Sequence, residues 1–295
     1  MADAEGEEVY AVDAAAVRAR GAAYDEAALD ELLRERVIAV VLDVEGREDI
    51  RHLLADPPAT EFEASRLADL IDEPRVLELW RVGEAIGEVF LVDCRDCFFP
   101  WPSGRDLKNP SASLPGADLV GFAVEGQSER FAFGEVKTSQ SEDAPPSVMY
   151  GRSGLITQLE GLRDEIRVKD ALVLYLGFRA QDAPWCDRYR EAARRYFADH
   201  TDVSLFGVLV RDVEPNRTEL ARPPHFTSTQ CGHCGFAEVV APPGRAFDEP
   251  QVGEKLVVGR IGRRATVVDE DLEPDLTRVP GDRLAVLSVE NGIAG

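Results

Sequence analysis

Two carboxylates and a lysine follow one another in the order and spacing that a metal-dependent hydrolytic site requires. Asp118 lies in Gly116-Ala-Asp-Leu-Val-Gly-Phe, and Glu135 and Lys137 lie in Phe133-Gly-Glu-Val-Lys-Thr-Ser. Carboxylate oxygens are ligands that Mg²⁺ and Mn²⁺ prefer, and a lysine two residues beyond Glu135 lies on the same side of a strand. The spacing predicts a site in which a bound ion and Lys137 activate water against a phosphodiester bond.

The segments around these residues predict a hairpin that brings the acids together. Apolar residues alternate along 118–124 and 130–137, and Glu125-Gly-Gln-Ser between them is typical of a hairpin loop. This loop pairs Val120 with Phe133 and Phe122 with Phe131, so that Asp118 lies opposite Glu135 at the mouth of an apolar core. The alternative is a hairpin whose acids face water. Against it, the acids share a face with phenylalanines, where an unpaired carboxylate is costly.

This arrangement resembles the PD-(D/E)xK nuclease superfamily, whose motif reads here Pro115-Gly-Ala-Asp118 followed by Glu135-Val-Lys137. The residue directly before Asp118 is Ala117 and not proline. The resemblance implies a restriction-endonuclease-like α/β fold, in which helices flank a mixed central sheet, and a nuclease activity that depends on Mg²⁺ or Mn²⁺. Asp118, Glu135 and the backbone carbonyl of Val136 are the expected ligands of that ion.

A helix is predicted upstream, from Pro74 to Val92, and it carries two acids on an apolar stripe. In the superfamily a glutamate on the helix before the sheet often belongs to the site, and Glu84 or Glu88 matches that role. Gly83 and Gly87 would allow this helix to approach a neighbour closely. The alternative places both acids at the wet edge of an amphipathic helix.

A second helix is predicted over 148–166, where Gln158 interrupts a stripe of leucines. In the superfamily a glutamine here supports water or substrate near the metal, which makes Gln158 a candidate site residue. The alternative is an amide hydrogen-bonded within the core.

The remaining pattern divides the chain into three regions: a mixed N-terminal region over 1–73, possibly used for docking, a nuclease core over 74–215, and a C-terminal β-rich region over 216–295. The other predicted helices lie at 25–36, 47–55, 61–72 and 185–200. The other predicted strands lie at 37–42, 170–178, 203–211, 255–258 and 283–289.

Composition opposes an autonomous nucleic-acid binder. The 295 residues include 33 Lys and Arg against 55 Asp and Glu, a formal net charge of −22, whereas affinity for a phosphate backbone comes from basic residues. A salt-adapted host is another source of such acidity. Arg152, Arg163, Arg167 and Lys169 around the second helix are candidates for a local basic groove, and the commoner alternative is that they form a solvated face. We therefore expect a basic partner or another subunit to deliver the nucleic acid; DNA is favoured over RNA as the substrate.

Cysteines form two C-x-x-C pairs, Cys94 with Cys97 and Cys231 with Cys234. The second pair, in Cys-Gly-His-Cys, is typical of a zinc knuckle, and together the pairs supply four thiolates for one structural Zn²⁺. His225 or His233 is a possible substitute ligand, and unrelated reduced thiols are the alternative. Cys186 is expected to be a lone structural thiol.

Two classes of function follow from these features. The chain resembles Hachiman-type anti-phage nuclease subunits, which implies the effector subunit of a bacterial defence complex. The alternative is a catalytically inactive scaffold of the same fold that binds a basic partner. A protein that mimics DNA through its charge would leave Glu135-Val-Lys137 unexplained. No run of apolar residues suggests a membrane span, and the acidic start lacks the pattern of a signal peptide, so a cytoplasmic location is expected.

Overall fold

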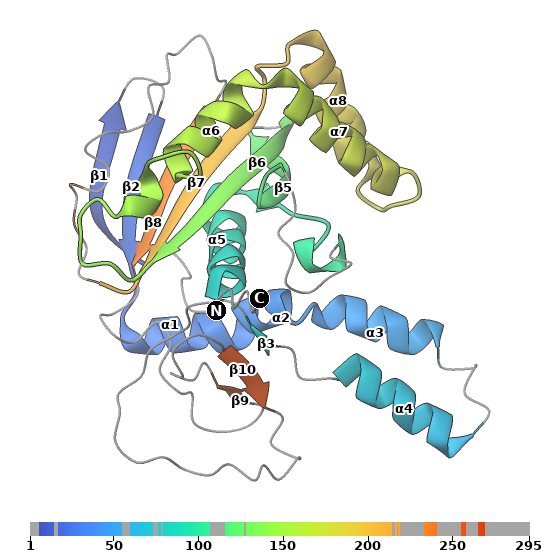
Figure 1. Ribbon diagram of the computed structural model, residues 1–295. Helices are drawn as coiled ribbons and strands as arrows, with labels where there is room; N and C mark the ends of the chain where they lie inside the picture. Colours follow the sequence, from blue (N-terminus) through green and yellow to red (C-terminus); the bar gives the residue numbers. More distant parts are fainter. Residues whose placement is uncertain are drawn as a thin grey trace, which may run out of the picture.

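The computed structural model describes residues 6–14, 17–54, 60–72, 76–77, 79–106, 116–126, 128–213, 216, 218, 233–240, 255–257 and 265–268. Within these ranges the chain is a mixed α/β protein, with helices on both faces of a large mixed sheet (Figure 1). The α/β class expected from the sequence is confirmed. None of the described helices combines the length and the apolar composition needed to cross a membrane.

The central sheet contains strands from the whole length of the described chain. In chain order they are β1 (Glu7–Ala14), β2 (Val17–Ala23), β4 (Cys97–Phe98), β5 (Leu119–Glu125), β6 (Ser128–Ser139), β7 (Ser204–Arg211) and β8 (His233–Val240). Their order across the sheet is β1-β2-β8-β7-β6-β5-β4. The inner pairs β2–β8, β8–β7 and β7–β6 are parallel, and the outer pairs are antiparallel. Every residue of β7 is buried, as expected for a central strand covered on both faces.

This sheet crosses both region boundaries suggested by the sequence. Strands β1 and β2 come from the N-terminal region, and β8 comes from the C-terminal region and lies between β2 and β7. A separate small sheet pairs β3 (Val76–Leu77) with β10 (Ala265–Val268), which also pairs with β9 (Lys255–Val257). The expected strand at 283–289 lies outside the described residues.

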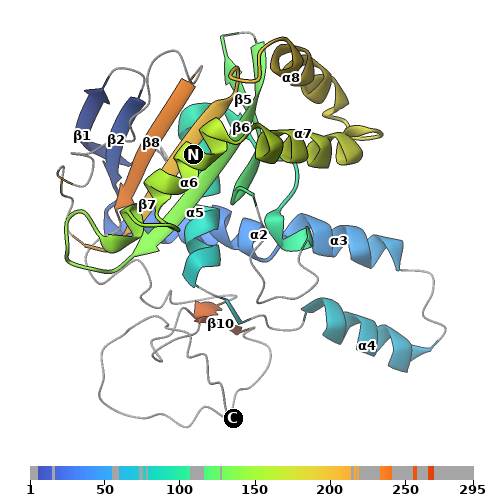
Figure 2. The ribbon, with the colours of Figure 1, turned by 45° about the horizontal axis from the view of Figure 1, so that its top comes forward.

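Two helical layers cover the sheet. The helices are α1 (Glu26–Leu32), α2 (Ile38–Val41), α3 (Val44–Leu53), α4 (Glu61–Asp72), α5 (Leu79–Arg95), α6 (Leu155–Asp164), α7 (Ile166–Ala180) and α8 (Cys186–Ala198). One apolar core lies between the sheet and α1 and α5, and a second lies between the sheet and α6, α7 and α8. Figure 2 shows α5 and α6 on opposite sides of the sheet.

The hairpin of β5 and β6 has the register expected from its apolar alternation. Val120 pairs with Phe133 and Phe122 pairs with Phe131. Both phenylalanine side chains of the second pair are fully buried in the core beneath α6, α7 and α8. This register directs the following residues of β6 on the same face, Glu135 and Lys137, toward the start of β5.

Close contact between α5 and β6 depends on two glycines. A Cβ atom on Gly83 would lie 1.9 Å from Oγ1 of Thr138, and one on Gly87 would lie 2.9 Å from Cγ2 of Val136. No side chain larger than hydrogen fits at Gly83 without movement. The close approach predicted from the spacing of these glycines is confirmed.

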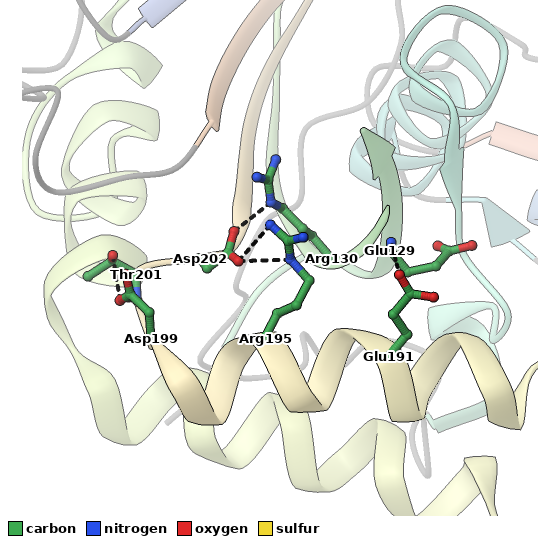
Figure 3. Close-up of polar contacts among 7 residues, drawn as sticks. All are labelled: Glu129, Arg130, Glu191, Arg195, Asp199, Thr201 and Asp202. Carbon is green, nitrogen blue, oxygen red and sulfur yellow. Dashed lines mark hydrogen bonds and ion pairs between the residues drawn. The ribbon is translucent and has the colours of Figure 1, made fainter. Parts of the chain in front are cut away.

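Ion pairs and hydrogen bonds join α8 to the beginning of β6, which is the end of that strand farther from Glu135. Asp202 accepts hydrogen bonds from Nε of Arg130 at 2.5 Å and from Nε of Arg195 at 2.8 Å (Figure 3). On the neighbouring turn of α8, the carboxylate of Glu191 accepts from the backbone N–H of Glu129 at 3.3 Å. These contacts fix the second helical layer on the sheet.

Two predicted strands are wrong, because both segments are helical. Residues 37–42 continue from a π-helical turn at Leu33–Val37 into α2, and residues 170–178 belong to α7. In α7 the buried residues Leu172, Val173 and Leu176 follow helical spacing, whereas Leu174 is exposed. Short apolar runs fit either a buried strand or a helix, and local periodicity alone does not separate the two.

Two predicted helices begin later than expected. Helix α5 starts at Leu79 and not at Pro74, since Val76 and Leu77 pair with β10. Helix α6 starts at Leu155, after a 3₁₀ turn over Ser147–Met149. The segments 25–36, 47–55, 61–72, 185–200, 203–211 and 255–258 contain the predicted kind of element, with shifted boundaries.

Candidate metal-dependent hydrolytic site

Asp118, Glu135 and Lys137 meet where β5 begins. The Nζ atom of Lys137 lies 3.4 Å from Oε2 of Glu135 and 3.8 Å from Oδ2 of Asp118. The side chains of Asp118 and Lys137 are 21% and 22% exposed, whereas that of Glu135 is 2% exposed. The cluster is therefore open to solvent on the side of Asp118 and closed on the side of Glu135.

A backbone hydrogen bond orients Asp118. The N–H of Val136 donates to Oδ2 of Asp118 at 2.8 Å, and Val136 stands between Glu135 and Lys137 in β6. The carboxylate just before β5 is thus tied to the strand that carries the other two groups. Val136, whose carbonyl is the expected third ligand, pairs with Val208 of β7, and ligation by that carbonyl stays a prediction.

Burial, the negative charge of Asp118 and a hydrogen bond between the two carboxyl groups together raise the pKa of Glu135 to about 8. The ammonium group of Lys137 acts in the opposite direction. Two carboxyl groups this close do not both ionise readily unless a cation compensates them. The pair therefore holds a proton at neutral pH in the absence of a metal ion.

Helix α5 directs Glu84 to the same cluster. The pKa of Glu84 is raised to about 8, chiefly by burial and then by the charge of Asp118, while the charges of Arg81 and Lys137 act in the opposite direction. This dependence on Asp118 and Lys137 indicates that Glu84 lies within electrostatic range of the site. The close contact at Gly83, the adjacent residue, brings this turn of α5 against β6.

Glu88, one turn further along α5, faces a different environment. Burial, with a smaller contribution from the negative charge of Asp43, raises its pKa to about 7. Asp43 accepts two hydrogen bonds from Arg105, each 2.7 Å long. Of the two acids predicted for a site role on this helix, the structure associates Glu84 with the cluster and Glu88 with Asp43.

The donor set fits a hard divalent cation. Mg²⁺ keeps several waters and is bound by one or two carboxylates, and Asp118 and Glu135 supply that number. Across the described ranges, His, Cys, Asp and Glu side chains form no group of three or more close enough to hold one ion. Glu84 lies within electrostatic range of the two acids.

Gln158 lies on α6, among the leucines that cover the sheet on the Phe133 side. Its Oε1 atom is buried and accepts no hydrogen bond from the described residues. The structure establishes no contact between Gln158 and the two acids. The predicted role at the site therefore remains a prediction.

Strand order separates the two cysteine pairs. Cys97 lies on β4 and Cys234 on β8, with β5, β6 and β7 between them. Four inter-strand spacings amount to about 19 Å, whereas zinc–sulfur bonds of about 2.3 Å require thiolates within a few ångströms of one another. This strand order does not favour one Zn²⁺ held by all four cysteines, which stays a prediction. Cys231 lies outside the described residues.

Two of the four residues considered for the basic groove make contacts within the protein. Lys169 is 3% exposed and its Nζ donates to the backbone carbonyl of Arg163 at 2.6 Å. Arg163 forms two hydrogen bonds with the carboxylate of Asp164. Arg152 and Arg167 are exposed and remain available for contact with a polyanion.

Two further residues influence the site, and neither was predicted from the sequence. Arg81 lowers the pKa of Glu84, and its position three residues earlier on the same helix face was a readable signal. Thr138 meets Gly83 and so sets the separation of α5 and β6. No sequence pattern marks Thr138, because its importance depends on packing between distant segments.

No family model and no curated protein sequence matches this chain. Any inference about the class of protein therefore rests on its α/β fold and on the cluster of Asp118, Glu135 and Lys137.

Proposed function

We propose that this protein is a Mg²⁺- or Mn²⁺-dependent nuclease with a restriction-endonuclease-like core. The observation that carries the proposal is the meeting of Asp118, Glu135 and Lys137 at the start of β5. Two adjacent carboxylates oppose binding of a polyanion unless a cation lies between them. A lysine within 4 Å of both acids adds a positive group where a phosphate would approach that cation.

Each residue of the cluster has a defined task in this proposal. Asp118 and Glu135 would bind the ion, which when present lowers the pKa of bound water and offsets charge on the phosphate. Lys137 orients the attacking water and stabilises negative charge in the transition state. Glu84, whose pKa responds to Lys137, helps to fix the position of that lysine.

The acidity of the chain favours an effector that receives its substrate from a partner. With 55 acidic and 33 basic residues, the protein repels nucleic acid at long range. A helicase or another basic subunit of an anti-phage complex would bring DNA to the site. Dependence on this partner would also limit cleavage of host DNA.

The test is cleavage of DNA and RNA, single- and double-stranded, with Mg²⁺ or Mn²⁺. Glu135→Ala and Lys137→Ala are each expected to lower the rate by about 10²–10³-fold, since each removes a group that acts in the transition state. Glu142→Ala, at an exposed acid just beyond β6, is the matched control and should cleave normally. Equal cleavage by all variants would show that the assigned residues are wrong. Complete inactivity of the wild type, with and without partners that purify with it, would favour the non-catalytic scaffold.

A further inference from the structure

Helices α3 and α4 form an arm that lies away from the central sheet. They lie side by side in both views, on the far side of α2 from β1 and β2 (Figures 1 and 2). Helix α3 ends at Leu53 and α4 begins at Glu61. The end of α3 and the beginning of α4 are therefore the tip of the arm.

The tip exposes two large apolar side chains. Leu53 is 72% exposed and Phe62 is 70% exposed. Ile50, one turn before Leu53 on the same face of α3, is 44% exposed. Single exposed apolar residues are common on protein surfaces, but several at one tip mark a binding surface more often than chance does.

Capping contacts give the arm a definite shape. Asp43 caps α3 by accepting from the N–H of Gly46 at 3.2 Å, and its ion pair with Arg105 joins α3 to the body. At α4, Oγ1 of Thr60 accepts from the N–H of Glu63 at 3.2 Å, and Oε2 of Glu63 accepts from the N–H of Thr60 at 3.1 Å. This reciprocal capping box fixes the turn that presents Phe62.

The arm is acidic around its apolar tip. Helices α3 and α4 together contain seven acidic residues and three basic ones, which are Glu45, Glu48, Asp49, Glu61, Glu63, Asp69 and Asp72 against Arg47, Arg51 and Arg66. A nucleic acid or an anionic membrane would meet repulsion here. A second copy of this chain would bring the same acidic surfaces face to face across a two-fold axis.

We infer that the α3–α4 tip docks a basic protein partner, whose apolar residues cover Leu53 and Phe62 while its lysines and arginines pair with the surrounding acids. Apolar anchors surrounded by charge are typical of specific interfaces, in which the anchors supply affinity and the charges speed association. The inference extends the proposed function by placing the partner that delivers substrate. Binding at the tip is nevertheless measurable whether or not the protein cleaves nucleic acid.

The experiment uses the full chain and a fluorescent amphipathic helical peptide of leucine and lysine as the probe. Binding is followed by anisotropy for the wild type, for Leu53→Ser/Phe62→Ser, and for Leu174→Ser/Phe178→Ser. The last variant removes one leucine and one phenylalanine, 57% and 73% exposed, from α7 and serves as the matched control. We expect the tip variant to bind about tenfold more weakly or worse, a change of about 1.4 kcal/mol, and the α7 variant to bind as the wild type does.

Two further measurements separate the contribution of charge from that of the apolar contacts. A peptide of equal length and charge with serine in place of leucine should bind weakly to all three proteins, and salt should weaken the leucine–lysine peptide. Equal affinity of the tip variant and the wild type would overturn the inference. It would also be overturned if sedimentation showed that the wild type is a dimer and the tip variant a monomer. The tip would then bind a second copy of the chain. Repeating the binding with Glu135→Gln keeps this result independent of the nuclease proposal.

Discussion

The backbone N–H of Val136 donates to Oδ2 of Asp118 at 2.8 Å, which joins the two strands of the candidate site through the residue between Glu135 and Lys137. This bond leaves the carboxylate of Asp118 beside that of Glu135, where its negative charge helps to raise the pKa of Glu135. The most direct predictions concern this pair.

Asp118→Asn keeps the size of the side chain and removes its charge. Because one of two anionic ligands is lost, we expect the affinity for Mn²⁺, measured by calorimetry, to fall about 10- to 100-fold. The pKa of Glu135 should fall as well, since the charge of Asp118 helps to raise it. Asp182→Asn, at an exposed acid, is the control. Unchanged Mn²⁺ affinity in Asp118→Asn would remove Asp118 from the ligand set.

Stability of the metal-free protein should fall as pH rises from about 4.5 to about 8. The pKa values of Glu84 and Glu135 are raised from 4.5 to about 8 in the folded protein. Between these limits the unfolded chain releases protons that the folded chain retains, and this favours unfolding. Denaturant titrations at several pH values measure the slope, which Glu84→Gln/Glu135→Gln should flatten. An unaltered slope in that variant would assign the effect to other groups.

Divalent ions should reverse this pH dependence. The ion must displace the proton held by the pair, so Mn²⁺ should raise the melting temperature more at a pH above 8 than at pH 6. Calorimetry in buffers of different ionisation enthalpy should detect proton release near neutral pH. The same thermal shift at both pH values, with no release of protons, would contradict binding at Glu135.

Gly83→Ala should destabilise the protein because the new methyl group meets Oγ1 of Thr138. We expect a loss of about 1–3 kcal/mol in the free energy of unfolding, the usual range for overpacking. Thr138→Ala in the same chain should restore part of it. The control is Gly161→Ala on α6, where the nearest atom lies 3.9 Å away and higher helix propensity should stabilise by up to about 1 kcal/mol. Equal effects of the two alanines would argue against the close contact.

Asp202→Ala should cost about 1.5–3 kcal/mol, because it removes the carboxylate that accepts charge-assisted hydrogen bonds from the partly buried Arg130 and Arg195. Asp187→Ala is the matched control, since the Asp187–Arg190 pair is exposed and should contribute less than about 1 kcal/mol. Chemical denaturation measures both. Mn²⁺ affinity should persist in Asp202→Ala, given that the cluster lies at the other end of β6.

Local pattern was enough to predict the hairpin, because the pairing of Val120 with Phe133 follows from side-chain alternation and a short loop. It also predicted the close packing of α5, since Gly83 and Gly87 recur one turn apart. Residues 170–178 show the limit: an apolar run fits both a strand and a helix until its neighbours are known. Likewise, the separation of Cys97 from Cys234 depends on strand order, which no local spacing encodes.

The position of β8 has a consequence for biosynthesis. Strand β2 pairs with β8 on one side, and this pairing aligns Val17 with Cys234. As the chain emerges from the ribosome, the edge of β2 that later pairs with β8 therefore stays unpaired until nearly all of the sheet has been translated. Such long-range parallel pairing is slow and exposes an edge to aggregation. We expect the protein to complete its sheet only once β8 has emerged from the ribosome, and to depend on chaperones until then.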